Sequence, residues 1–236
     1  MKIYLFYLVI FSFTIMSCGN DNEFQKPISI FETSTIEDKQ GNTYKTIKIG
    51  NQWWMQDDLN ATEFAGGKPI LKVTEPSVWV ETNEPAYMVG PSCNLYNYAT
   101  VEKAEDIVPD GWHVATDDDF KKLEMELGMS VDEVDKNLWR GQNIATKLKE
   151  DYQKGAWNYH KDVWGDNESG FTALPCGCIL FDGRPCEPSN LSQGYWWTST
   201  TSDNEAWFRY MDYKSNEIFR YVASKNYGMA IRCVKN

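Results

Sequence analysis

The sequence has little of what catalytic and nucleic-acid-binding proteins need. Histidine occurs only twice, at His113 and His160, and no Ser/His/Asp order, P-loop or dinucleotide-binding glycine motif is present. Basic residues occur only as scattered pairs such as Lys121-Lys122, and the formal net charge is -11. Because phosphate binding needs clustered Lys and Arg, this charge argues against a nucleic-acid partner. Hydrolytic and cofactor-dependent catalysis are disfavoured as well.

The sequence also lacks a hydrophobic run long enough to cross a membrane comfortably. The N-terminal run from Ile3 to Phe11 follows one early charge, Lys2, whereas a spanning helix needs about 20 apolar residues. This pattern is typical of a secretion signal, which we assign to residues 1–17. The sequence Ile15-Met16-Ser17-Cys18 resembles the bacterial lipobox, in which a small residue precedes a cysteine that is acylated. An ordinary signal peptide with an incidental cysteine is the alternative.

The residues after Cys18 predict a tether. Residues 19–23 are acidic, have no large apolar side chain, and resemble the tether of surface-exported lipoproteins of the Bacteroidetes. Residues 24–37 show no clear periodicity, so we assign 18–37 to the lipidated N-terminus and flexible tether, and 38–236 to the folded domain. Since several acyl chains together anchor a protein durably, we expect an outer-membrane lipoprotein that faces outward.

The folded domain begins with a hairpin signal. Two alternating runs, 44–49 and 52–55, flank Gly50-Asn51, in a register that places Trp54 opposite Ile47 on the inner face. Residues 93–101 are aromatic and fit either a strand or a short helix. Further strands are expected at residues 70–73, 86–89, 194–200, 206–213, 218–222 and 229–234.

Two helices are expected in the middle of the chain. Thr116 followed by the three aspartates 117–119 predicts a capped N-terminus, and Gly128 predicts the end of this helix. Ser130 predicts the start of a second short helix that runs through Trp139. Strands, then helices, then a block of strands indicate an α+β fold.

Several motifs occur in an order that resembles a known family, the Fibrobacter succinogenes major paralogous domain, over roughly residues 38–236. The motifs are Asn42 to Met55, Leu95-Tyr96-Asn97-Tyr98, Pro109 to Thr116, Ser169-Gly170-Phe171, Tyr195-Trp196-Trp197-Thr198-Ser199 and Arg232-Cys233-Val234. The resemblance implies a C-type-lectin-like fold, related to that of the formylglycine-generating enzyme. Such a fold has a mixed, mostly antiparallel sheet, two or more flanking helices and long loops. A resemblance in fold does not by itself identify a ligand.

The cysteines favour disulfides, because the expected location is oxidising. With Cys18 acylated, an odd number of the six cysteines remains, so at least one is free or pairs with another chain. If their segment is extended, Cys176 and Cys178 share a face, and Cys186 returns opposite them around a turn. We expect Cys186 to pair with Cys178 or with Cys176. A metal site at these three residues is disfavoured by their close spacing.

The remaining cysteines are interpreted through the resemblance. Family members usually have Ile-Cys-Pro where this sequence has Ile107-Val108-Pro109, so Cys233 has lost what we take to be its customary partner. The resemblance therefore implies that Cys93 replaces this partner and pairs with Cys233.

The candidate ligand site is a loop between late strands. Asp203, Asn204 and Glu205 offer hard oxygen ligands beside the aromatic face of Trp207, which suits calcium or a sugar. Solvated loop acids explain the same residues, and the calcium-lectin signatures EPN and WND are absent. The sequence has ten tryptophans, most of which we expect in the core. No cofactor is expected apart from this candidate calcium.

The sequence thus favours a cell-surface lipoprotein that carries a binding or adhesion module. Its partners are the membrane, through the lipid anchor, and a glycan or a surface protein. The alternative is a structural or assembly component of a surface complex or fimbria-like appendage. An enzyme ranks third, because no catalytic motif is present.

Overall fold

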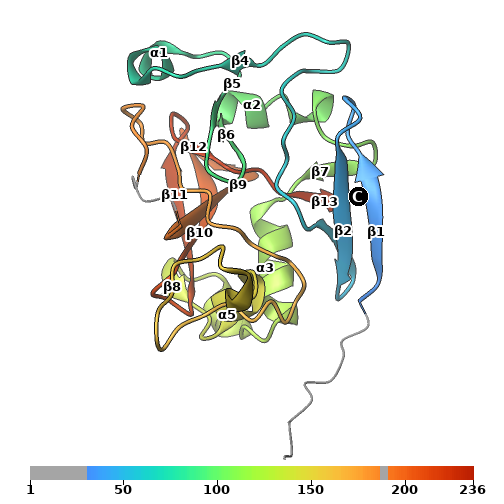
Figure 1. Ribbon diagram of the computed structural model, residues 1–236, viewed down its shortest axis with the longest axis vertical. Helices are drawn as coiled ribbons and strands as arrows, with labels where there is room; N and C mark the ends of the chain where they lie inside the picture. Colours follow the sequence, from blue (N-terminus) through green and yellow to red (C-terminus); the bar gives the residue numbers. More distant parts are fainter. Residues whose placement is uncertain (1–30, 187–190) are drawn as a thin grey trace, which may run out of the picture. The chain divides into compact units, whose positions relative to one another are not determined.

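The computed structural model describes residues 31–186 and 191–236, in which short strands alternate with a few helices (Figure 1). The predicted signal peptide (residues 1–17), the lipidation site Cys18 and the first part of the tether lie outside the described residues. The strands are β1 (Thr33–Glu37), β2 (Thr43–Ile49), β3 (Gln52–Met55), β4 (Leu71–Lys72), β5 (Ala86–Val89), β6 (Asn94–Asn97), β7 (Trp112–Val114), β8 (Leu138–Arg140), β9 (Gln193–Ser202), β10 (Glu205–Asp212), β11 (Ile218–Ser224), β12 (Gly228–Met229) and β13 (Cys233–Lys235). The helices are α1 (Pro76–Glu81), α2 (Tyr98–Val101), α3 (Asp117–Glu126), α4 (Val131–Val134) and α5 (Ile144–Leu148), with the 3-10 turns η1 (Ala104–Asp106) and η2 (Tyr152–Lys154).

The strands of the described residues form three sheets. Their orders are β1-β2-β3-β13-β7, β8-β11-β10-β9 and β12-β6-β5-β4. The strands pair antiparallel in these sheets, apart from β4 and β5, which are parallel. The predicted α+β class with mostly antiparallel strands is therefore confirmed. In the first sheet β13, from the last residues of the chain, lies between β3 and β7.

The β2–β3 hairpin has the predicted register. Ile47 pairs with Trp54, and Gly50 adopts the positive φ of 56° that this tight turn requires. The Trp54 side chain is fully buried, and its ring lies 5.1 Å from the ring of Phe120 and 5.4 Å from that of Phe171, measured between centroids. Since Phe120 belongs to α3, this aromatic contact packs the first sheet against that helix.

Helix α3 begins with the capping box that its sequence predicts. The Thr116 hydroxyl accepts a hydrogen bond from the Asp119 amide at 3.0 Å, and the Asp119 carboxylate accepts one from the Thr116 amide at 3.0 Å. Gly128 follows the helix with a φ of 107°. In Figure 1 the helix lies between β2 on one side and β10 on the other.

The tether prediction was wrong at its C-terminal end. Residues Thr33–Glu37 form β1, which pairs antiparallel with β2, so the folded part begins before Asp38. Because most side chains of this edge strand are exposed, its sequence carries no alternation between apolar and polar residues.

Two further predictions needed correction, and one open choice was resolved. The helix expected from Ser130 through Trp139 ends at Val134, and β8 follows; the positive φ of 68° at Leu138 does not fit a helix. Residues 93–101 contain both expected elements, because β6 is followed directly by α2. The expected last strand is divided into β12 and β13, which belong to different sheets.

A cluster of buried charges joins α3 to the second sheet. We call it the buried charge cluster, and its members are Asp117, Glu124, Arg140, Arg209 and Arg220. Arg209 of β10 bonds both acids of α3, with Nη1 2.7 Å from an Asp117 oxygen and Nε 2.6 Å from a Glu124 oxygen. Arg220 of β11 also bonds Asp117, and Arg140 of β8 bonds Glu124. Each carboxylate therefore bridges two arginines from different strands.

The Glu124→Gln variant tests this cluster. Removing the charge leaves Arg140 buried without its counter-ion and leaves Arg209 with Asp117 alone, which lowers the free energy of unfolding by about 3–5 kcal/mol. The matched control is Glu102→Gln, whose ion pair with Lys225 is half-exposed and contributes at most about 1 kcal/mol. Urea unfolding of the full chain measures both. Equal losses in the two variants would contradict the role of the cluster.

Candidate functional site

The predicted ligand loop lies at the tip of the β9–β10 hairpin. Asp203 and Asn204 form the two-residue turn, Asp203 has a φ of 53°, and the side chains of residues 203–205 are exposed. Trp207 lies further along β10, where the Arg220 guanidinium carbon lies 3.7 Å from its ring centroid and covers that face of the ring. Among the described residues, no group of three His, Cys, Asp or Glu side chains is placed to hold a metal ion. Calcium at this turn stays a prediction.

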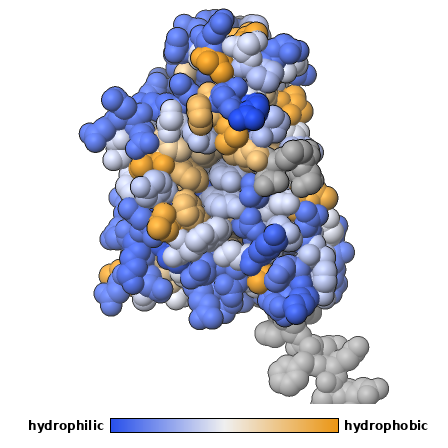
Figure 2. Space-filling view, turned by 90° about the vertical axis from the view of Figure 1, so that its left-hand side faces the viewer, coloured by the Kyte–Doolittle hydropathy of each residue, from blue (hydrophilic) through white to orange (hydrophobic). Residues whose placement is uncertain are grey.

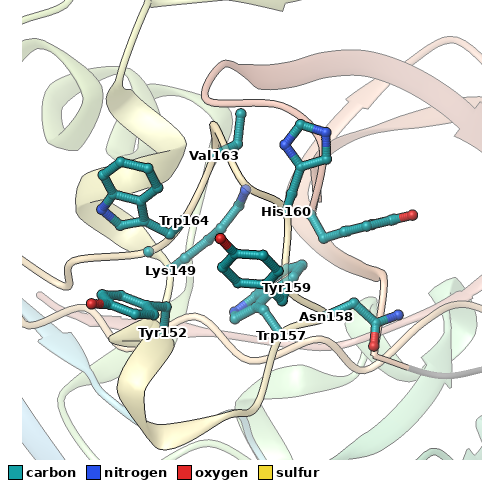
Figure 3. Close-up of a pocket in the computed structure, with 10 residues that line it drawn as sticks. Lys149, Tyr152, Trp157, Asn158, Tyr159, His160, Val163 and Trp164 are labelled. Atoms are coloured by element: carbon teal, nitrogen blue, oxygen red, sulfur yellow. The ribbon is translucent and has the colours of Figure 1, made fainter.

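The structure places a different set of aromatic residues around a surface pocket, which we call the aromatic pocket. It surrounds a small cavity of about 30 Å³ that opens to solvent, and it is lined by Lys149, Tyr152, Trp157, Asn158, Tyr159, His160, Val163, Trp164, Gly165 and Tyr213. Most of these residues follow α5, whereas Tyr213 follows β10. Figure 3 shows Trp164 and Tyr152 on one side, His160 on the other and Tyr159 across the middle.

Two buried side chains anchor the pocket to the domain. The Trp157 indole N–H donates to the Ala173 carbonyl at 2.8 Å. The Lys149 ammonium donates to the carbonyls of Asp212 at 2.6 Å and Ser215 at 2.7 Å, and lies 5.3 Å from the Trp157 ring centroid. Burial lowers the pKa of Lys149 to about 8. These bonds hold the segment after α5 against the end of β10.

The outer part of the pocket is built from exposed aromatic rings. Tyr152, Tyr159 and Trp164 are 47%, 75% and 46% exposed. The Tyr152 and Trp164 rings lie 6.2 Å apart, and the His160 ring stands edge-on to the Tyr213 ring at 6.3 Å, between centroids. Large rings are usually buried, so three exposed ones around one pocket suit ligand contact. The one signal of this pocket in the sequence is the density of aromatic residues between Tyr152 and Trp164.

His113 is hydrogen-bonded at both ring nitrogens. Its Nε2 lies 2.9 Å from an Asp119 carboxylate oxygen, and its Nδ1 lies 2.6 Å from the Asn236 amide oxygen. The bond to Asp119 raises the pKa of His113 above its ordinary value. Burial raises the pKa of Asp119, but the bonds from His113 and Thr116 outweigh it and lower that pKa to about 2. The pair therefore fixes β7 to α3 instead of serving a ligand.

The disulfide among the described residues joins two cysteines that the sequence analysis did not pair with each other. Cys93 is bonded to Cys176, so neither Cys93–Cys233 nor Cys176–Cys186 forms. Gly177 has a φ of 71°, which breaks the extended backbone that would put Cys176 and Cys178 on one face. Cys176 therefore turns toward Cys93, while Cys233 is a buried thiol in β13.

The sequence motifs meet inside the domain, away from the aromatic pocket. Asp58 Oδ1 accepts hydrogen bonds from the Arg232 Nε at 2.7 Å and from the Trp196 indole N–H at 2.8 Å. Arg232 also donates to the Phe171 carbonyl at 2.7 Å, and its guanidinium carbon lies 4.4 Å from the Phe171 ring centroid. Arg232, Trp196 and Phe171 are fully buried. These motif residues hold the fold together and do not form a surface site.

Comparison with known proteins agrees with these motifs. Residues 47–235 match the Fibrobacter succinogenes major domain. Neither the search of curated proteins nor that of solved structures found a match.

The His113–Asp119 pair predicts a pH-dependent stability. Because the pKa of His113 is raised in the folded state, its contribution is complete below the unfolded value of about 6.5 and is lost as the pH rises through the folded value. The free energy of unfolding, measured in urea across this range, should therefore fall with rising pH. His113→Gln should remove this fall, whereas the control His160→Gln should keep it. The same fall in both variants would contradict the assignment.

Proposed function

This chain belongs to the Fibrobacter succinogenes major domain family, and we propose that it is a surface-exposed outer-membrane lipoprotein whose folded domain binds a glycan. The proposal joins two parts of the chain. The signal sequence and Cys18 supply the anchor, and the aromatic pocket supplies the binding site. The pocket carries the proposal, because three large aromatic rings around it are exposed to solvent.

A C-type-lectin-like arrangement is the fold that we propose for the folded part of the chain, from β1 to β13. Three features support it: strands near both ends of the described chain share one sheet, α3 packs between sheets, and long irregular connections carry the aromatic pocket. In such an arrangement the loops differ in sequence while the sheets keep their geometry, so ligand contacts belong to loops.

A neutral sugar fits the groups that line the aromatic pocket. The C–H faces of a pyranose ring pack on indole and phenol rings, and its hydroxyls bond to amides, imidazoles and phenols. Asn158, His160 and Tyr159 provide such polar groups. None of the described lining residues is Asp or Glu, and the Lys149 ammonium is already bonded to two carbonyls. The lining therefore favours neither a cation nor an anion.

A glycan array probed with the full chain, with calcium and again with a chelator, tests the site. We expect binding that survives chelation and weakens about tenfold in Trp164→Ala or Tyr159→Ala, since a lost ring contact is worth about 1.5 kcal/mol. The control Tyr221→Ala removes an exposed ring of β11 outside the pocket and should bind normally.

Two other outcomes of the array would overturn the pocket as the glycan site. Binding lost on chelation would direct attention to Asp203, Asn204 and Glu205 at the β9–β10 turn. A blank array from folded protein would favour the assembly role instead. Two observations support that second candidate: β1 is an edge strand of its sheet, and Figure 2 shows hydrophobic residues gathered across the middle of one face.

The lipid anchor is tested separately by cell fractionation. Acyl chains contribute about 0.8 kcal/mol per buried methylene, so Cys18→Ala should move the protein from the membrane fraction to the soluble one. Ser17→Ala keeps a small residue before the cysteine and is the matched control. Retention of the Cys18→Ala variant in membranes would refute the anchor. Among residues 31–186 and 191–236, no helix is long and apolar enough to span a membrane.

A further inference from the structure

Residues 178–186 form a tight hairpin that brings two cysteines opposite each other. The Cys186 amide donates to the Cys178 carbonyl at 2.9 Å, and the Leu180 amide donates to the Arg184 carbonyl at 2.8 Å. Gly183 occupies the turn with a φ of 80°. Side chains that face each other across such a pair have Cβ atoms about 4.5–5.5 Å apart, close to the separation that a disulfide spans.

The sulfur of Cys186 already contacts the backbone of Cys178. The Cys178 amide donates to the Cys186 Sγ at 2.8 Å, so the Cys186 side chain points across the hairpin toward Cys178. The thiol of Cys178 is buried, whereas Cys186 is partly exposed. Cys176, two residues before Cys178, is bonded to Cys93, so oxidation has taken place in the same segment.

We infer that Cys178 and Cys186 form a second disulfide, which closes the 178–186 hairpin when the chain folds in an oxidising compartment. This pairing, together with Cys93–Cys176, leaves Cys233 as the one thiol among the described cysteines. Cys233 is fully buried in β13, and burial raises its pKa, so it stays reduced.

The order of the two exchange steps follows from exposure. The accessible Cys186 thiolate attacks a low-molecular-weight disulfide such as oxidised glutathione, forms a mixed disulfide and releases one glutathione thiolate. Cys178 then loses its proton and attacks the Cys186 sulfur, which releases the second glutathione. Two protein thiols are oxidised and one glutathione disulfide is reduced to two thiols. The hydrogen bond with Cys186 and burial both raise the pKa of Cys178, which makes Cys178 the second to react.

The disulfide would fix the hairpin strand that contains Cys186 to the strand that contains Cys178. The strand with Cys178 is already held by hydrogen bonds to β12. Next to Cys178, Ile179 exchanges two backbone hydrogen bonds of 2.8 Å with Gly228 of β12. Gly183 at the turn lies so close to Pro76 of α1 that a Cβ there would meet the Pro76 carbonyl oxygen at 2.4 Å. The disulfide therefore fixes a hairpin that connects α1 with β12.

Peptide mapping of the full chain tests the pairing directly. The chain is refolded with oxidised and reduced glutathione, alkylated under denaturing conditions and cut before aspartate, which separates Cys178 from Cys186 at Asp182. We expect residues 58–105, 166–181 and 182–202 in one cross-linked species, and an alkylated Cys233 in residues 212–236. Alkylated Cys178 and Cys186, with only residues 58–105 and 166–181 linked, would overturn the inference.

The Tm of oxidised and reduced protein distinguishes a Cys178–Cys186 disulfide from a contribution of the Cys186 side chain to packing. In the oxidised protein, Cys186→Ser should lower the Tm by roughly 5 °C. After reduction, the Tm of the variant and of the unaltered chain should coincide within about 1 °C, because neither then has the bond. A loss of equal size in the reduced proteins would show that Cys186 acts by packing alone and would contradict a disulfide.

Discussion

The arrangement of this domain depends on the buried charge cluster between α3 and the strands β8, β10 and β11. Arg209 is fully buried and bonds an acid at each of two positions of α3, seven residues apart in the sequence and on one face of the helix. Such a cluster adds little net stability, because desolvation offsets most of the attraction. The cluster instead fixes the geometry, since each guanidinium donates its hydrogen bonds to carboxylate oxygens close to its own plane. The helix therefore has one rotation and one depth on the sheet.

The other features of the fold follow from that placement. With α3 fixed, Phe120 contacts Trp54 and Phe171. The first sheet and the second sheet therefore share one apolar core. The motif residue Arg232 and its partner Asp58 complete this core, and their buried ion pair helps to specify the architecture. We propose that ligand recognition belongs to segments that the core does not constrain. The residues around the aromatic pocket form such a segment. A few buried hydrogen bonds hold it to the domain, while its outer rings face solvent.

Local chemistry explains which parts could be predicted from the sequence. The Gly50-Asn51 turn and the Thr116 capping box act over a few residues, so their signals determined the first hairpin and the start of α3. Edge strand β1 has few buried side chains, and β8 depends on pairing with distant β11, so neither has a local signal. The Cys93–Cys176 bond required the positive φ of Gly177, which no periodicity reveals. The aromatic pocket joins residues after α5 to Tyr213, and only the folded chain brings them together.

The central claim is that ligand contact belongs to the aromatic pocket and not to the buried motifs or the β9–β10 turn. It is tested most directly by following the tryptophan indole N–H resonances of the full chain while neutral mono- and disaccharides are added. Signals are assigned by replacing Trp164 and Trp207 singly with Phe. The account predicts that the Trp164 resonance shifts with a saturating dependence on sugar, while those of Trp54, Trp196 and Trp207 stay in place. A shift confined to Trp207, or no shift at any tryptophan, would contradict it.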